Sequence, residues 1–223
     1  MKATVVLGCF CLCFAFGQPV DAEPSASTSE ESDLVSPDKR WEYKAPTGSE
    51  DARIVKAGSN EIAVSLVDDC DIGCEHASVL WAPGSKGFAF NRGDGKERLT
   101  SVYELREGRW QELQSLGEDD AIQRRTYDIV KAQANRKRLP KKTFLHMQWS
   151  TARAISWIDP STLTIYSSLA MRVHRQDGED VGEGFGADVL FTIRFDEAGK
   201  WKIVKTHQMS EKEAEKYEQE IER

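Results

Sequence analysis

The chain has 223 residues, a formal net charge of −7 and a hydrophobic content of 39%. General nucleic-acid-binding proteins are usually basic, so this charge argues against that class, and we expect no sequence-specific nucleic-acid partner. About 200 residues remain after the leader described next, which fits one domain able to fold around its own core.

The first 22 residues have the pattern of a secretory signal peptide. Lys2 gives a positive start, an apolar run follows over residues 5–16, and Val20-Asp21-Ala22 matches a signal peptidase site. We therefore expect cleavage after Ala22 and a secreted or periplasmic protein. The run is shorter than the roughly 20 apolar residues of a membrane span; an uncleaved anchor is the alternative. No later segment is apolar enough to cross a membrane.

Residues 23–36 are predicted to form a disordered acidic leader. The stretch is rich in serine and poor in apolar residues, and no base occurs before Lys39 in the mature chain. A β-rich domain is expected over residues 37–209, followed by an amphipathic helix over residues 210–223.

Strand patterns dominate the first half of this domain. Alternating apolar residues predict strands over 61–67, 78–81 and 87–91. Asp94-Gly95 lies between apolar runs and predicts a tight hairpin, because both central residues of such a turn need positive φ. A second hairpin is expected around Glu107-Gly108, between residues 102–105 and 110–113.

The apolar period then changes to that of a helix near residues 118–138. Ile122, Ile129 and Val130 lie at helical spacing. The first turn is acidic and the last is basic, which suits the helix dipole, and Pro140 ends the element.

Strands are expected again over residues 144–149, 154–158 and 163–173. A loose connection through Gly182, Gly184 and Gly186 leads to a closing hairpin of residues 188–195 and 200–206. The glycine run precedes a strand rather than a helix, so we predict no dinucleotide cofactor. Ser210 and Glu213 form a capping box for the terminal helix, which is expected to lie on the sheet surface.

These elements define the fold class as mainly β, a β-rich α+β protein. We expect an antiparallel sheet, or an incomplete propeller-like or sandwich arrangement of hairpins, with one mid-chain helix and one C-terminal helix.

A repeated phrase supports the hairpin architecture. Ser36–Tyr43 and Ala82–Phe90 each contain a Pro-led turn, a basic residue and alternating aromatics, and Asp159–Tyr166 and Asp196–Ile203 echo it more loosely. The phrase resembles the blade phrase of WD40-like, TolB-type β-propeller repeats. That resemblance implies strand–turn–strand hairpins in an exported protein that binds proteins or ligands on one face. It covers about a quarter of the chain, and a closed propeller needs at least four blades, so we expect an open sheet. Turn chemistry common to any β protein is the alternative origin of the phrase.

Cys70 and Cys74 are the cysteines that remain after signal cleavage. An oxidising compartment favours a disulfide, which would contribute roughly 2 kcal/mol. Free thiols and a metal site are the alternatives, but zinc would need a second pair of ligands, so we predict no metal.

No catalytic motif occurs in the chain. The four histidines are scattered, and there is no nucleophile elbow, phosphate loop or zinc-protease motif. If the protein is nevertheless a hydrolase, the candidate acids and bases are Asp68, Asp71, Glu75 and His76.

Five basic residues form a candidate anion-binding patch: Arg136, Lys137, Arg138, Lys141 and Lys142. They can meet phosphates, anionic lipid heads or glycans, or simply satisfy the carbonyls at the end of the helix. The six tryptophans fall at strand positions, which favours core packing; exposed ones would indicate a carbohydrate or peptide platform.

The sequence therefore predicts an exported, non-catalytic binding or protein-interaction module with a protein, glycan or peptide partner. The alternatives are an exported hydrolase or accessory enzyme, and an envelope-associated structural protein.

Overall fold

The computed structural model describes residues 34–47, 51–70, 73–74, 76–94, 97–114, 116, 121–137, 139, 141–177 and 180–221. The predicted signal peptide and most of the acidic leader lie outside these residues, as do Gly95, the first turn of the predicted mid-chain helix and Pro140.

The described chain is mainly β with two long helices, as predicted. Its elements in order are β1 (Trp41–Lys44), β2 (Arg53–Lys56), β3 (Ile62–Ser65), the short 3-10 helix η1 (Asp68–Cys70), β4 (Ser78–Trp81), β5 (Gly87–Gly93), β6 (Glu97–Arg106), β7 (Arg109–Glu112), α2 (Ala121–Arg136), β8 (Thr143–Asp159), β9 (Thr162–Arg175), β10 (Asp180–Phe195), β11 (Trp201–Gln208) and α3 (Glu211–Ile221).

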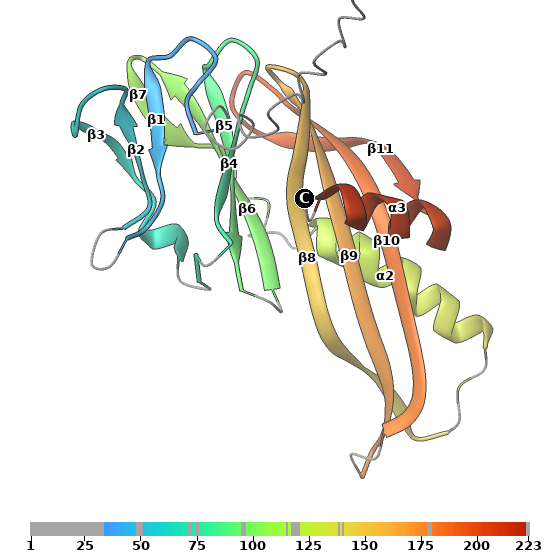
Figure 1. The fold of residues 1–223 in the computed structure, drawn as a ribbon. Coiled ribbons are helices and arrows are strands. Elements are labelled where there is room, and N and C mark those ends of the chain that lie inside the picture. The colour runs from blue at the N-terminus through green and yellow to red at the C-terminus, as the bar shows by residue number, and fades with distance from the viewer. Residues whose placement is uncertain are drawn as a thin grey trace, which may run out of the picture.

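The N-terminal half consists of two small sheets packed face to face (Figure 1). One is the antiparallel sheet β1-β2-β3, and the other is the β4-β5-β6 part of the large sheet, with β7 paired to β6. Between them lies a cluster of aromatic side chains: Tyr43, Phe88, Phe90, Tyr103 and Trp110 are buried, and Trp41 and Trp81 pack against them. Phe88 stacks on Tyr103 with ring centroids 4.8 Å apart.

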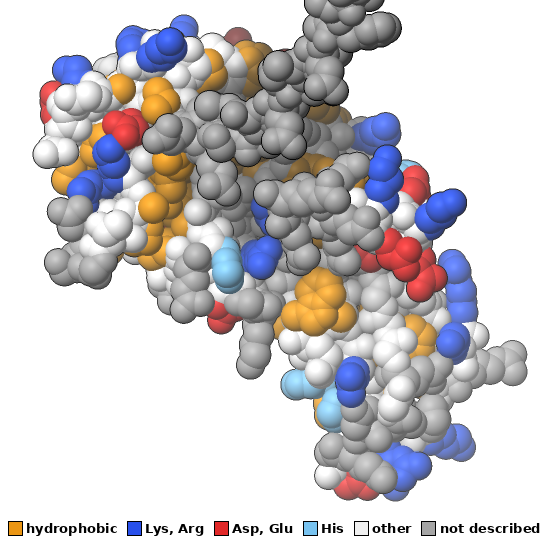
Figure 2. All heavy atoms as spheres, in the orientation of Figure 1, with side chains coloured by type: hydrophobic (Ala, Val, Ile, Leu, Met, Phe, Trp, Pro, Cys, Tyr) orange, Lys and Arg blue, Asp and Glu red, His pale blue; other side chains and the backbone are white. Residues whose placement is uncertain are grey.

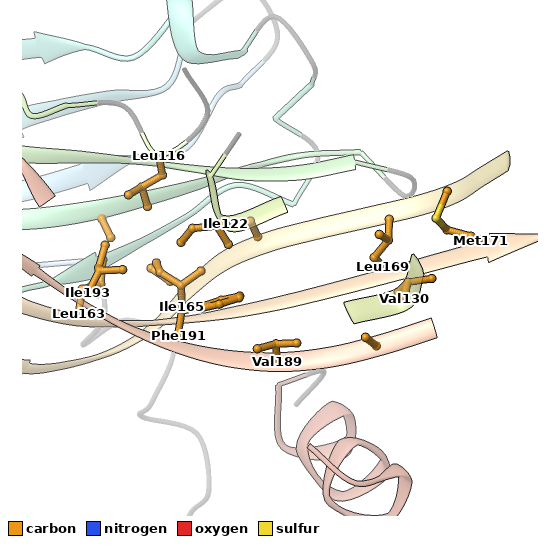
Figure 3. Packing of buried hydrophobic residues seen from close by; sticks show 14 of the residues in the cluster. Leu116, Ile122, Val130, Leu163, Ile165, Leu169, Met171, Val189, Phe191 and Ile193 are labelled. Atoms are coloured by element: carbon orange, nitrogen blue, oxygen red, sulfur yellow. The ribbon is translucent and has the colours of Figure 1, made fainter. Parts of the chain in front are cut away.

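The C-terminal half is one helix packed on four long antiparallel strands, β8 to β11. Ile122, Thr126, Val130 and Ala134 form the buried stripe of α2, because residues four apart lie on one helix face. Figure 3 shows Ile122 and Val130 of this stripe beside the inward side chains of β9 and β10, among them Ile165, Leu169, Val189 and Phe191.

The two helices lie on opposite faces of this sheet. Even-numbered residues of β9 point away from α2, and one of them, Tyr166, packs against Tyr217 of α3 with ring centroids 5.6 Å apart. The predicted capping box is present: Ser210 N donates to Glu213 Oε2 at 2.7 Å, and Glu213 N donates to Ser210 Oγ at 3.4 Å. The terminal helix lies on the sheet surface, as expected.

The two halves of the large sheet are joined by very little backbone. β6 and β8 pair in parallel over only Glu97↔Ser150 and Arg98↔Thr151. Beyond that point the side chain of Asn91 on β5 makes the hydrogen bonds to β8 that a neighbouring strand would make. Its Nδ2 donates to Ala154 O at 3.0 Å, and its Oδ1 accepts from Ala154 N at 2.8 Å.

Two further side chains support this junction. Thr100 Oγ1 lies 3.1 Å from Ala152 O and 3.0 Å from Ala154 N. Trp157 Nε1 donates to Leu80 O at 3.0 Å. Asn91 and Thr100 are both buried, so these hydrogen bonds are shielded from water.

The hairpin predicted around Glu107-Gly108 is confirmed, and the strands on either side of Asp94-Gly95 do pair, although Gly95 itself lies outside the described residues and Asp94 does not have the positive φ that was expected. β5 and β6 are antiparallel with Gly93 opposite Arg98, and β6 and β7 are antiparallel with Arg106 opposite Arg109. Glu107 and Gly108 have φ of 50° and 78°, as a tight hairpin turn requires.

The two copies of the repeated phrase meet in space. Asp38 N donates to Ser85 Oγ at 2.9 Å, so the two Pro-led turns are hydrogen-bonded to each other. The rings of Tyr43 and Phe90 lie 6.0 Å apart.

Two expectations about the strands are wrong, and two strands were missed. The strands predicted over 144–149 and 154–158 are one continuous strand, β8, which bends through bulges instead of ending. Gly182, Gly184 and Gly186 lie inside β10 rather than in a loose connection, because pairing with β9 outweighs the low strand preference of glycine. β1 and β2 were not predicted as strands.

The junction makes a direct prediction. Asn91→Leu keeps the branched shape of the side chain but leaves the Ala154 carbonyl without this donor, and each buried unpaired polar group costs about 1–3 kcal/mol. We expect the free energy of unfolding to fall by roughly 2–4 kcal/mol, measured by urea denaturation. Asn135→Leu, the same change at an exposed position of α2, is the control and is expected to stay within about 0.5 kcal/mol of the parent. Equal losses in the two variants would show that the amide bridge does not hold the halves together.

Candidate functional site

Cys70 and Cys74 lie at disulfide-bonding distance, with Cα atoms 5.3 Å apart. They bracket the end of η1 and the loop beyond it, next to the aromatic cluster of the N-terminal half. Asp71 and Glu75 lie outside the described residues.

The structure gives no support to the predicted hydrolase residues as a group. Asp68 and His76 are both exposed. Within the described ranges, no group of three or more His, Cys, Asp or Glu side chains is arranged to hold a metal ion.

A buried polar cluster lies beside them, and sequence reasoning missed it. Asp69 Oδ1 accepts from Ser101 Oγ at 2.6 Å and lies 3.0 Å from Arg92 Nη1, while its Oδ2 accepts from the hydroxyl of Tyr103. Every partner comes from β5 or β6, so the cluster fixes η1 against the sheet. Removing one member of a buried ion pair costs about 3–5 kcal/mol, and we assign the cluster a structural role.

Two buried tyrosines in this half have raised pKa values. Burial raises the pKa of Tyr103 far above its ordinary value, and the hydrogen bond to Asp69 raises it further. Burial alone raises the pKa of Tyr43 from 10.0 to about 12. The Tyr43 hydroxyl has no hydrogen-bond partner among the described residues.

The predicted basic patch surrounds the turn between α2 and β8, at the far end of the C-terminal sheet. Arg136, Lys137, Lys141 and Lys142 are exposed, and Arg138 lies outside the described residues. Lys137 Nζ sits 5.7 Å from the centre of the Phe185 ring. We call residues 136–142 the basic turn. Residues 131–149 contain six Lys and Arg and no Asp or Glu, in a chain with a net charge of −7.

Five of the six tryptophans lie in or against the hydrophobic cores, as their strand positions predict, and Trp149 is the exception. Trp110 is buried, and Trp41, Trp81, Trp157 and Trp201 are half-buried and pack against the two cores. Trp149 of β8 is 38% exposed.

Trp149 belongs to a row of ring side chains on the face of the sheet opposite α2. Phe144 and His146 precede it on β8, and their partners on β9 are His174 and Arg172. A bulge between Met147 and Trp149 brings Trp149 onto the same face, where it lies opposite Ala170. We call Phe144, His146, Trp149, Arg172 and His174 the β8–β9 face.

The rings of this face touch one another. The His174 ring lies 6.0 Å from that of Phe144, nearly parallel to it, and 5.1 Å from that of His146, edge-on. Figure 2 shows this side of the molecule, with hydrophobic and histidine side chains together over the lower part of the sheet and Lys and Arg around its far end.

The surface beside these rings is flat. Gly184 lies opposite Arg172 and Gly186 opposite Ala170 on β10, so the neighbouring positions of this face carry no side chain beyond Cβ. Alternate strand residues are about 6.6 Å apart, so the ring row extends over roughly 15 Å. An extended ligand can lie along it.

Comparison with known proteins found no matching family model, no similar curated protein and no similar solved structure. Among the described residues, no helix is both long enough and apolar enough to cross a membrane.

The raised pKa of Tyr43 predicts a loss of stability at high pH. A folded-state pKa above the unfolded value means that the folded form holds the proton more tightly, so this contribution is complete below pH 10 and is lost as the pH rises toward 12. Tyr43→Phe removes no hydrogen bond and should weaken the fall of the thermal midpoint between pH 9.5 and about 11.5. Tyr103→Phe, which loses the bond to Asp69, should already be less stable at pH 7. The account of Tyr43 is wrong if Tyr43→Phe and the parent lose stability with the same slope.

Proposed function

We propose that this chain is an exported, non-catalytic module that binds an acidic polysaccharide on the β8–β9 face. The observation that carries the proposal is the row of exposed rings beside Arg172, next to the basic turn. Export rests on the signal peptide predicted for residues 1–22.

The rings suit a sugar chain. Phe144 is 47% and Trp149 is 38% exposed, although both are large apolar side chains that would gain by burial. Sugar rings present flat C–H faces that pack on aromatic rings and release water from both. Burying about 100 Å² of apolar surface is worth about 2.5 kcal/mol at 25 cal/mol per Å², so two rings supply a useful part of a moderate affinity.

The charge favours an acidic chain over a neutral one. Arg172 lies in the middle of the face, and its planar guanidinium can pair with a carboxylate or sulfate. The basic turn extends the positive potential beyond the end of the ring row. Anionic phospholipid shares this charge, but the flat, glycine-bordered surface offers room for a chain lying along the strands rather than a tip that inserts into a bilayer.

The composition of the face favours binding over cleavage. Glycosidases use a pair of carboxyl groups on either side of the scissile bond. The five residues that define the β8–β9 face include no carboxylate. A ligand held there would be bound without meeting the acid and base that hydrolysis needs.

The test compares polygalacturonate with its fully methyl-esterified form, in which each carboxylate is replaced by an uncharged methyl ester, by calorimetry at 50 and 300 mM salt. We expect the acid form to bind, the ester to bind at least tenfold more weakly, and salt to weaken the acid form. Trp149→Ala should weaken binding about tenfold, which corresponds to about 1.4 kcal/mol. Lys141→Ala with Lys142→Ala should weaken binding and reduce its salt dependence.

Two matched controls come from the same sheet. Ile158→Ala removes a 61% exposed side chain at the other end of β8, and Lys205→Ala removes an exposed charge from β11; neither should change the affinity. The proposal fails if Trp149→Ala binds like Ile158→Ala, or if the ester binds as tightly as the acid. It also fails if anionic phospholipid vesicles bind the parent more tightly than the polysaccharide does.

A further inference from the structure

β10 continues well past the end of its outer neighbour. β11 pairs with residues 189–195 of β10, whereas β10 begins at Asp180. The outer edge of β10 before Asp188 therefore has no strand beside it among the described residues. An uncovered edge presents backbone donors and acceptors that can pair with another chain.

The direction of these backbone groups follows from one hydrogen bond. Met209 N donates to Asp188 O at 2.8 Å, so the backbone of Asp188 points toward the outer edge. The backbone N–H and C=O groups of successive residues point to alternate edges of a strand, so those of Gly186 and Gly184 also point to the outer edge. The pairing of β10 with β9 is regular from Gly184 to Asp188, so no bulge interrupts this alternation.

A hollow of about 510 Å³ lies at this edge, where β11 ends. Its walls come from both helices as well as from β10, and its main lining residues are Gln133, Asp188, Met209, Glu211, Ala214 and Glu215. The hollow thus lies beyond the end of β11, with Gln133 of α2 on one side and residues of α3 on the other.

The hollow is acidic on the α3 side. Glu211 and Glu215 are exposed, and Asp188 is half-buried and accepts from Tyr166 OH at 2.7 Å. The net charge of this wall favours an occupant with Lys or Arg side chains. A second copy of this chain fits less well, because its own β10 edge is lined by the same carboxylates, Asp188, Glu211 and Glu215.

We propose that this edge is a docking site for a basic, extended segment of a partner protein, which adds to the sheet as a short strand beside Gly184 and Gly186. Backbone pairing with the two glycines supplies the register, and alternate Lys or Arg side chains meet Glu211 and Glu215. This site lies on the outer edge of the sheet, shares Gly184 and Gly186 with the border of the β8–β9 face, and does not depend on polysaccharide binding.

The probe is the peptide acetyl-Lys-Val-Lys-Val-Lys-Val-amide, followed by amide NMR of the full chain. We expect a dissociation constant of about 1 mM or tighter, with the largest shifts and new exchange protection at Gly184 and Gly186. The same peptide N-methylated at alternate residues cannot pair on one edge, and the Glu-Val peptide has the wrong charge; each should bind at least tenfold more weakly.

Two variants test the site from the protein side. Gly184→Pro removes an outward N–H without removing a bond to β9, a change that edge strands accept. It should abolish the shifts, and Glu211→Gln with Glu215→Gln, which leaves the backbone alone, should weaken binding severalfold. Binding of the N-methylated peptide as tightly as the parent peptide would overturn the proposal, and so would no shift at 5 mM peptide. A dimer in sedimentation that Gly184→Pro converts to monomer would assign the edge to a second copy and would also overturn it.

Discussion

The amide of Asn91 and the hydroxyl of Thr100 are the interaction on which the arrangement of the two halves depends. β6 and β8 share only two paired residues before they diverge. These side chains make hydrogen bonds to the backbone of Ala152 and Ala154. Without them, buried backbone N–H and C=O groups of β8 would lose these hydrogen-bond partners, which buried polar groups need. These side chains join the two halves where β6 and β8 diverge, and Ala89 of β5 and Val102 of β6 pack into the core of the C-terminal half. The N-terminal half therefore covers only the upper part of β8.

That partial cover leaves the first part of this strand exposed to solvent. From Ser150 to Ala152 the residues of β8 are buried, whereas Phe144 and residues 146–149 are exposed. α3 packs over Tyr166 on the same side and leaves the lower strands open. The exposed stretch combines rings, Arg172 and an adjacent basic turn, and the bare glycines of β10 border it. The same glycines present the outer edge of the sheet, so one short segment of β10 contributes to both proposed sites.

Much of the fold could be predicted because it follows from local chemistry. Turn residues located the hairpins at Asp94-Gly95 and Glu107-Gly108, helical spacing located α2, and a capping box located the start of α3. The parallel contact of β6 with β8 could not be predicted, since it is supported by hydrogen bonds between the Asn91 side chain and the Ala154 backbone, which lie 63 residues apart. The β8–β9 face could not be predicted from the sequence for a different reason. Phe144 and His146 are even-numbered and Trp149 is odd-numbered, so strict alternation places them on opposite faces until the bulge is known. The burial of Asp69 beside the exposed Asp68 could not be predicted either, because its partners Arg92, Ser101 and Tyr103 lie on strands that are distant in the sequence.

The proposed polysaccharide site requires that the lower part of the β8–β9 face is exposed to solvent in the free protein. Hydroxyl-radical footprinting of the chain, resolved by mass spectrometry at each of the six tryptophans, tests this directly. Trp149 should be oxidised fastest and Trp110 slowest, with the four others between them, following their exposed fractions. If Trp149 proves as protected as Trp110, another segment or a second molecule covers the face, and the arrangement described here is wrong.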